Sequence, residues 1–242
     1  MHSPGPFIVA LCVIPARGGS KRIPRKNERA FGGQPMIAWS IQAALASGCF
    51  EQVVVSTDDD EIAAVTREYG ASVPFLRPVE LADDFVGTTD VVVHAIEQLA
   101  PVDGNRLLVC CLYATAPFVR SEDLRLGHAL WLAQEPSRPV FTAATYPFPI
   151  QRAFVMNPNG CAEMLQPNCY HIRSQDLPDA YHDAGQFYWA DSAQWLGRPE
   201  FSRGAVPLIL PRWRVQDVDT EEDWRQAELL HRLLDDSHHS LS

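Results

Sequence analysis

Apolar and polar positions follow one another along the first half of the chain in blocks typical of alternating strands and helices. Continuous apolar runs at 7–14, 52–56, 73–76, 106–112 and 139–144 predict buried strands, and the same pattern returns at 206–210. Helical spacing predicts helices between Pro35 and Gly48, over 61–69, 88–99 and 121–134, and after Thr220. We therefore expect an α/β fold with a mostly parallel sheet and helices on both faces.

The pattern changes near Tyr146. From 146 to about 195 the chain is rich in prolines and aromatic residues, and it offers short hairpin-like pieces without a long amphipathic helix. We interpret this stretch as a small subdomain inserted into a single domain that spans 1–242, a length that one domain accommodates.

The loops that follow the predicted strands are the natural place for a site. In an open parallel sheet, ligands bind beyond the carboxyl ends of the strands. The loops at 15–29, 57–60, 113–120 and 215–219 therefore belong to one candidate crevice.

The composition of the chain mainly disfavours certain classes of protein and kinds of site. The formal net charge of −10 disfavours a general nucleic-acid binder. No apolar run approaches the ~18 residues that a membrane helix needs. The first residues lack the basic region of a signal peptide, so we expect a cytoplasmic protein without a membrane partner. The six cysteines form no C-x-x-C pair, which disfavours a zinc site or a disulfide framework.

The positive charge is concentrated in one loop. Both lysines of the chain, Lys21 and Lys26, lie there together with four arginines: Arg17, Arg22, Arg25 and Arg29. An acidic protein that gathers its cations in this way is suited to bind an anion, and the alternative is a solvated basic loop.

The same loop has the chemistry of a phosphate site, although it matches neither the P-loop nor the dinucleotide fingerprint. The missing fingerprint disfavours a nicotinamide oxidoreductase. Gly18 and Gly19 allow backbone amides to approach phosphate oxygens closely. Arg17 can bind phosphate through two N–H groups, Lys26 adds a compact charge, and Ser20 adds a hydroxyl donor.

Carboxylates follow two of the predicted strands. In an extended segment Asp217 and Asp219 point to the same side, and two carboxylates with substrate phosphates and waters can hold Mg²⁺. The alternative is that Asp219 and Thr220 only cap the last helix. Asp58 either caps the helix that follows it or contacts a nucleotide or metal.

Four segments in order along the chain, at 15–27, 55–58, 76–78 and 217–219, resemble the CMP-sugar synthetases that activate acidic keto-sugars. The resemblance spans nearly the whole chain. It implies a Rossmann-like α/β domain with a small dimerisation subdomain, and hence a homodimer. It also implies CTP as a substrate, Mg²⁺ as a cofactor, and transfer of CMP to the anomeric hydroxyl of an acidic nine-carbon sugar with release of pyrophosphate.

Two further segments, at 112–118 and 173–189, resemble most the members of this family that act on pseudaminic acid. Tyr113 stands where sialic acid enzymes tend to have a glutamine that helps to hold the sugar. A sialic or legionaminic acid enzyme is the alternative within the family. A non-catalytic nucleotide-binding protein on the same fold is the alternative outside it, and the intact Asp217/Asp219 and Arg17/Lys26 pairs count against it.

The resemblance also implies roles for individual residues. The catalytic residues are Arg17, Lys26, Asp217 and Asp219, of which the two aspartates are the metal ligands. The nucleotide-binding residues are Arg17, Gly18, Gly19, Ser20, Lys26, Asn27, Asp58 and Thr88. The sugar-binding residues are Tyr113, Thr115, Arg152, Arg173, Gln186 and Tyr188, with a surface ion pair as the alternative role of Arg152 and of Arg173.

Overall fold

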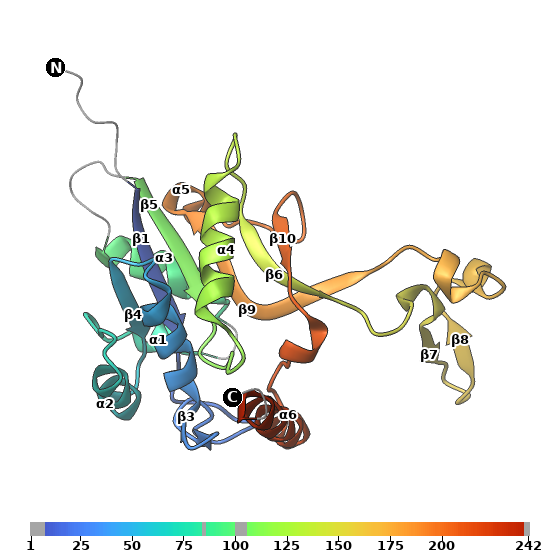
Figure 1. Cartoon of the computed structure of the whole chain (residues 1–242), viewed down its shortest axis with the longest axis horizontal. Helices are drawn as coiled ribbons and strands as arrows, with labels where there is room; N and C mark the ends of the chain where they lie inside the picture. Colours follow the sequence, from blue (N-terminus) through green and yellow to red (C-terminus); the bar gives the residue numbers. More distant parts are fainter. Residues whose placement is uncertain (1–7, 84–85, 100–105, 240–242) are drawn as a thin grey trace.

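The computed structural model describes residues 8–83, 86–99 and 106–239, the last five of them without side chains. A six-stranded sheet with the order β10-β6-β9-β5-β1-β4 forms its centre (Figure 1). The pairs β1/β4, β1/β5 and β6/β10 are parallel, and β9 is antiparallel to both of its neighbours. The strands are β1 (Ile8–Pro15), β4 (Gln52–Ser56), β5 (Arg106–Leu112), β6 (Val140–Thr145), β9 (Tyr181–Asp191) and β10 (Val206–Ile209). The expected mostly parallel sheet is confirmed.

Helices cover both faces of this sheet, as predicted. Successive side chains of β1 point to opposite faces. Cys12 and Ile14 pack in the apolar cluster that includes residues of α1 (Met36–Ser47), α2 (Asp60–Glu68) and α4 (Ser121–Leu132). Leu11 and Val13 pack in the cluster with α3 (Thr88–Leu99) and α5 (Ser192–Leu196). Both clusters exclude water from the sheet, which explains why the parallel strands are continuous apolar runs.

A third apolar cluster joins the loop after β1 to the last helix of the chain. The helix α6 (Glu221–His239) follows the sheet, and its Trp224 is buried against Phe31 of the short hairpin β2 (Ala30–Phe31) and β3 (Gln34–Pro35). Ile23 and Val218 are completely buried in the same cluster. Packing therefore fixes the loop after β1 next to the segment before α6.

The strand predicted at 73–76 is wrong. In its place the chain makes two isolated bridges, from Val54 to Ser72 and from Thr57 to Leu76, and then enters a short 3-10 helix, η1 (Val79–Leu81). Pro74 lies between the bridges and has no N–H to donate to a ladder, which explains why no continuous strand forms. The strand predicted from Phe7 begins at Ile8 in the structure, since Phe7 lies outside the described residues.

The region 146–195 is divided between an arm and the main sheet with its covering helices. Residues 146–180 form an arm that extends away from the sheet (Figure 1). It contains the antiparallel pair β7 (Phe154–Met156) and β8 (Ala162–Met164) and three 3-10 turns, η2 (Ile150–Arg152), η3 (Pro167–Cys169) and η4 (Ser174–Asp176). The remainder returns as β9 to the middle of the main sheet and as α5 to one of its faces. Among the described residues, none of the helices combines the length and apolar character that crossing a membrane requires.

Candidate active site

A pocket of about 480 Å³ opens beyond the carboxyl ends of β1 and β5. We call it the first pocket. It is lined by Pro15, Arg17, Ser20, Lys21, Arg22, Lys26, Asn27, Thr88, Tyr113, Ala114, Thr115 and Asp219. Three of the four predicted loops therefore meet there, and four cationic side chains make it suited to a polyanion. Lys21 and Arg22 line it although the resemblance gave them no role.

The loop after β1 is held in shape by its own contacts. Asn27 is buried, and its Nδ2 donates to the Arg17 carbonyl oxygen at 3.0 Å, which closes the loop on itself. Ile23 anchors the middle of the loop in the third apolar cluster. The side chains of Arg17 and Ser20 consequently reach the first pocket from a fixed backbone.

Asp58 lies behind this loop and is absent from the described lining of the first pocket. Its Oδ1 accepts a hydrogen bond from the Gly18 amide at 3.2 Å, and Arg77 lies 3.4 Å away. The neighbouring Asp59 caps α2 and would collide with any side chain at position 18, so Gly18 is required by close packing. At Gly19 an added Cβ meets no atom within 4 Å, and packing within the chain does not require glycine there.

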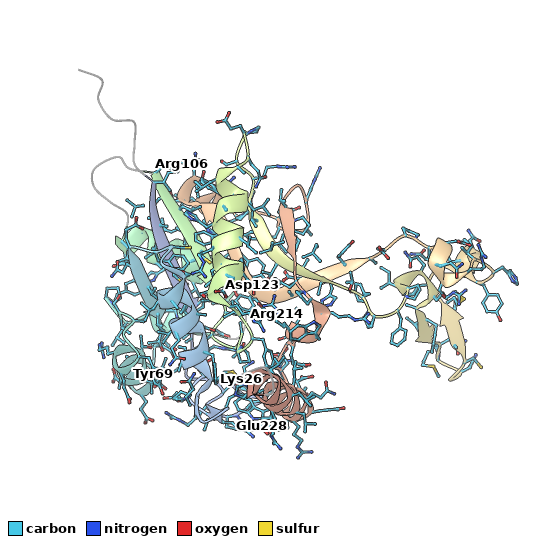
Figure 2. The ribbon with its side chains drawn as sticks, viewed as in Figure 1. Lys26, Tyr69, Arg106, Asp123, Arg214 and Glu228 are labelled. Carbon is cyan, nitrogen blue, oxygen red and sulfur yellow. The ribbon has the colours of Figure 1, made fainter. Side chains whose placement is uncertain are left out.

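The loop cations reach across to the carboxylates near the end of the chain. Lys26 Nζ donates to the Val218 carbonyl oxygen at 2.7 Å and lies 3.3 Å from Asp219 Oδ1. Arg22 Nη2 lies 2.8 Å from Asp219 Oδ2. Figure 2 shows Lys26 beside α6, where the loop after β1 meets the segment before that helix. The Asp219 carboxylate therefore faces the loop cations.

The capping role before α6 belongs to Thr220 and Asp223. The Thr220 Oγ1 accepts from the Asp223 amide at 3.2 Å, and Asp223 Oδ2 accepts from the amides of Thr220 and Asp219 at 2.7 and 3.1 Å. This reciprocal pattern satisfies the first amides of the helix. Capping explains Thr220 but does not occupy the carboxylate of Asp219 or Asp217.

A second pocket of about 470 Å³ lies against β9 and the segment before α6. It is lined by Tyr113, His182, Asp183, Ala184, Gly185, Tyr188, Val215, Gln216, Asp217 and Asp223. Asp217 thus faces the second pocket and Asp219 the first. Partial desolvation of the carboxyl, on a residue that is exposed overall, and then the negative charge of Asp219 raise the pKa of Asp217, so the two carboxylates repel one another.

Tyr113 is the wall that the two pockets share, because it lines both. Its ring centroid lies 5.4 Å from that of Tyr188. Ser40 Oγ donates to its carbonyl oxygen at 2.8 Å, and its own amide donates to the Gln186 carbonyl oxygen at 2.9 Å. Burial is the main cause that raises the pKa of both phenols.

The other predicted sugar-binding residues lie elsewhere. Thr115 lines the first pocket. Gln186 is buried, and its Nε2 donates to the Arg214 carbonyl oxygen at 2.8 Å. Arg152 and Arg173 lie on the arm, where Arg152 donates to the Ile172 carbonyl oxygen and Arg173 Nε lies 2.8 Å from Asp176. His182 and Asp183 line the second pocket without having been assigned to it, although both fall in the stretch 173–189 that carries the resemblance.

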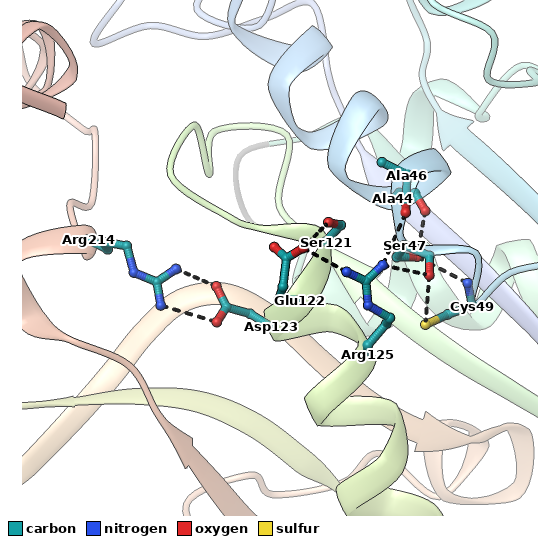
Figure 3. A network of polar contacts seen from close by, with 9 residues as sticks. All are labelled: Ala44, Ala46, Ser47, Cys49, Ser121, Glu122, Asp123, Arg125 and Arg214. Carbon is teal, nitrogen blue, oxygen red and sulfur yellow. Dashed lines mark hydrogen bonds and ion pairs between the residues drawn. The ribbon is translucent and has the colours of Figure 1, made fainter. Parts of the chain in front are cut away.

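A buried ion pair positions the segment that carries the two aspartates. Arg214 ends the 3-10 turn η5 (Arg212–Arg214), and its guanidinium makes two contacts with the Asp123 carboxylate of α4, at 2.5 and 3.1 Å (Figure 3). Both side chains are more than nine-tenths buried. The Arg214 backbone is held in addition by Gln186, so the chain enters 215–219 from a fixed point.

Comparison with known proteins agrees with this geometry. The family model described as "Cytidylyltransferase" matches residues 11–184. The chain is 46% identical to a pseudaminic acid cytidylyltransferase of Campylobacter jejuni over 224 residues, which cover 92% of this chain and 96% of that one. It is 34% identical to a CMP-N,N'-diacetyllegionaminic acid synthase of Legionella pneumophila, with the same shares covered.

Solved structures show the same fold. A CMP:2-keto-3-deoxy-manno-octonic acid synthetase complexed with CTP superimposes with a TM-score of 0.68 and 18% identity, over 93% of this chain and 99% of that one. At this identity the likeness concerns the fold alone.

The Asp123–Arg214 pair gives a prediction about stability. Asp123→Asn leaves the Arg214 charge buried beside a neutral amide, which costs about 3–5 kcal/mol in similar sites. We expect the free energy of unfolding in urea to fall by that amount. The matched control is Glu122→Gln on the adjacent exposed position, where loss of the pair with Arg125 is expected to cost less than about 1 kcal/mol. Equal losses for the two variants would contradict the anchoring role of the buried pair.

Proposed function

The chain belongs to the cytidylyltransferase family, and from this premise we propose that it transfers CMP from CTP to pseudaminic acid, an acidic nine-carbon keto-sugar. The observation that carries the proposal is the meeting of two pockets at Tyr113 and at the Asp217–Asp219 segment. The cationic first pocket suits a triphosphate, and the second suits an acceptor placed beside it. The 46% identity to the Campylobacter jejuni protein favours pseudaminic acid as that acceptor.

The proposed reaction is a displacement at phosphorus. The anomeric hydroxyl of the sugar attacks the α-phosphate of CTP, a new P–O bond forms, and the bond from the α-phosphorus to the bridging oxygen breaks as pyrophosphate leaves. Arg17 and Lys26 offset the charge of the departing pyrophosphate from the first pocket. The wall at Tyr113 and Tyr188 holds the acceptor at the boundary, so positioning supplies much of the acceleration.

Asp217 and Asp219 fit a magnesium ion that the substrate completes. Among the described residues no group of three or more His, Cys, Asp or Glu side chains is arranged to hold a metal. Mg²⁺ is commonly held by one or two carboxylates together with substrate phosphates and waters. Repulsion between the two carboxylates is the kind of strain that a cation relieves. When bound, Mg²⁺ polarises the α-phosphate and stabilises charge in the transition state.

The substrate is tested by incubating the full chain with a panel of acids and nucleotides. Pseudaminic, legionaminic and sialic acids are each combined with CTP, UTP, ATP and GTP in Mg²⁺, and release of pyrophosphate is followed. We expect the highest kcat/KM for CTP with pseudaminic acid. A preference for another acid would replace the proposed acceptor, and absence of pyrophosphate with every acid would favour a non-catalytic nucleotide-binding protein.

The metal role of the aspartates gives a second prediction. Asp219→Asn removes a charge that faces Lys26 and Arg22, and we expect kcat to fall about 100-fold or more, the magnitude typical of losing one electrostatic contact to the transition state. Glu222→Gln, on the exposed first turn of α6, is the control and should keep kcat within about twofold. Near-normal turnover of Asp219→Asn in Mg²⁺ would remove the metal role.

We further propose that two copies of the chain form a dimer through their arms. Apolar side chains of the arm are strongly exposed, among them Phe148 (79%), Met156 (63%) and Tyr170 (66%). Exposed apolar residues gathered in this way mark interaction surfaces. The second pocket also requires a cation for an acidic sugar, yet its described lining contains three carboxylates and neither Lys nor Arg. Arg152 or Arg173 from the partner's arm would supply that charge.

The dimer is tested with a charge placed on the arm. Phe154→Glu should convert the dimer to a monomer in light scattering, and kcat/KM for the sugar should fall about 10-fold or more, because a hydrogen bond to a charged group contributes about 1.5–3 kcal/mol. The dissociation constant of CTP should stay unchanged. Leu126→Glu, at an exposed position of α4, controls for the substitution itself. A monomeric native chain, or a dimer that persists in Phe154→Glu, would contradict the interface.

A further inference from the structure

The imidazole of His182 forms part of the wall of the second pocket, beside Asp183 and Asp217. His182 belongs to β9, where its backbone lies opposite Ala144 of β6. Its ring packs edge to face against the ring of Tyr146, with the two centroids 5.0 Å apart. Strand pairing and the ring contact therefore hold the imidazole in place in this wall.

A hydrogen bond determines which nitrogen of this ring carries the proton. The Nδ1 atom of His182 lies 2.8 Å from the carbonyl oxygen of Asp183. A carbonyl oxygen only accepts, so Nδ1 is the donor and carries the proton. In the neutral ring the lone pair then lies on Nε2. The contact with the backbone therefore leaves Nε2 as the nitrogen that can accept a proton.

The carboxylates of the second pocket have other tasks. Asp183 Oδ1 accepts from the Tyr188 hydroxyl at 2.8 Å. Asp223 Oδ2 accepts from the amide and the hydroxyl of Thr220 at 2.7 and 2.8 Å. Asp217 is the proposed metal ligand. Negative charge in the same pocket stabilises a positively charged imidazolium, so these carboxylates support a histidine that takes up a proton.

The proposed reaction requires a proton acceptor in this pocket, because the anomeric hydroxyl loses its proton when its oxygen bonds to phosphorus. A general base works best when it exchanges protons near the working pH, and histidine is the side chain that does so. Burial raises the pKa of the Tyr113 and Tyr188 phenols, which keeps them protonated. The titratable groups that face His182 or share its pocket are Asp183, Asp217, Asp223, Tyr113, Tyr188 and Tyr146.

We propose that His182 is the general base of the reaction, an inference that rests on the proposed function. Its Nε2 takes the proton of the anomeric hydroxyl as the O–H bond breaks and the new P–O bond forms. The electron pair of the P–O bond that breaks leaves with pyrophosphate. The Nδ1 proton stays on the Asp183 carbonyl oxygen throughout, and the imidazolium afterwards gives its extra proton to solvent.

The experiment replaces the imidazole by two amides, in the full chain with CTP, pseudaminic acid and Mg²⁺. His182→Gln places its amide near the position of Nε2 and keeps a hydrogen bond to the sugar possible. His182→Asn places its amide near Nδ1 and keeps the bond to the Asp183 carbonyl oxygen. Neither amide takes up a proton near neutral pH, so we expect kcat to fall about 100-fold or more in both, the magnitude typical of losing a general base. The KM for the sugar should change little.

The pH dependence of kcat adds a second measurement. In the native chain kcat should fall toward low pH as Nε2 becomes protonated, and this fall should be absent from both variants. His128→Gln replaces a histidine of α4 that stacks on Trp189 outside both described pocket linings, and it should keep the native kcat. Equal melting temperatures establish that the variants are folded, and each amide tests the base by itself where the other unfolds.

Three results would overturn the role of His182 while the native chain stays active. Near-native kcat in His182→Asn would assign the loss in His182→Gln to the missing Nδ1 bond. A higher KM for the sugar without a lower kcat would make His182 a binding residue. An unchanged fall of kcat at low pH in His182→Gln would assign the proton to another group. Absence of pyrophosphate from the native chain with every acid would instead overturn the proposed function itself.

Discussion

The site depends on the burial of two apolar side chains that lie between its charges. Ile23 stands among the loop cations and Val218 directly precedes Asp219, and both are fully buried in the cluster with Trp224. An ion pair with partly exposed members contributes little to stability, so the contact from Lys26 to Asp219 cannot by itself hold the loop after β1 against the segment before α6. Packing of the third apolar cluster brings these opposite charges together, and the chemistry follows from that placement.

The cations and the carboxylate that meet there suit an anionic and a cationic ligand, respectively. Without a ligand, Lys26 and Arg22 neutralise Asp219, so neither the cations nor this carboxylate is left without an opposite charge. In the proposed complex the cations turn to the phosphates and the carboxylate turns to a metal ion. The exchange replaces one set of opposite-charge contacts by two. Lys26 and Arg22 only partly offset the repulsion between Asp217 and Asp219. A bound metal ion would relieve the remainder.

The pattern of apolar and polar residues predicted those helices and strands whose bounds depend mainly on neighbouring residues in the sequence. The strand Gln52–Ser56 and the helix Thr88–Leu99 have the predicted bounds, because apolar runs and helical spacing report directly on burial. The prediction of a strand at 73–76 was wrong because Pro74 has no N–H to donate to a ladder, although its neighbours are apolar. The place of β9 between β5 and β6 depends on long-range pairing that no local pattern encodes. For the same reason, the sequence indicated a cationic loop and an aspartate pair but not the place of Asp183 in the second pocket.

The two halves of the site come from parts of the fold with different constraints. The first pocket is formed at the ends of buried parallel strands, where each backbone is fixed by neighbours on both sides. The second is formed by β9, which continues into the arm, and by the segment before α6. In the proposed reaction, a change in β9 or the arm can therefore alter which acceptor binds while the cationic loop keeps its shape. Tyr113 is the exception, since it lines both pockets and is fixed by the Ser40 hydroxyl and the Gln186 carbonyl oxygen.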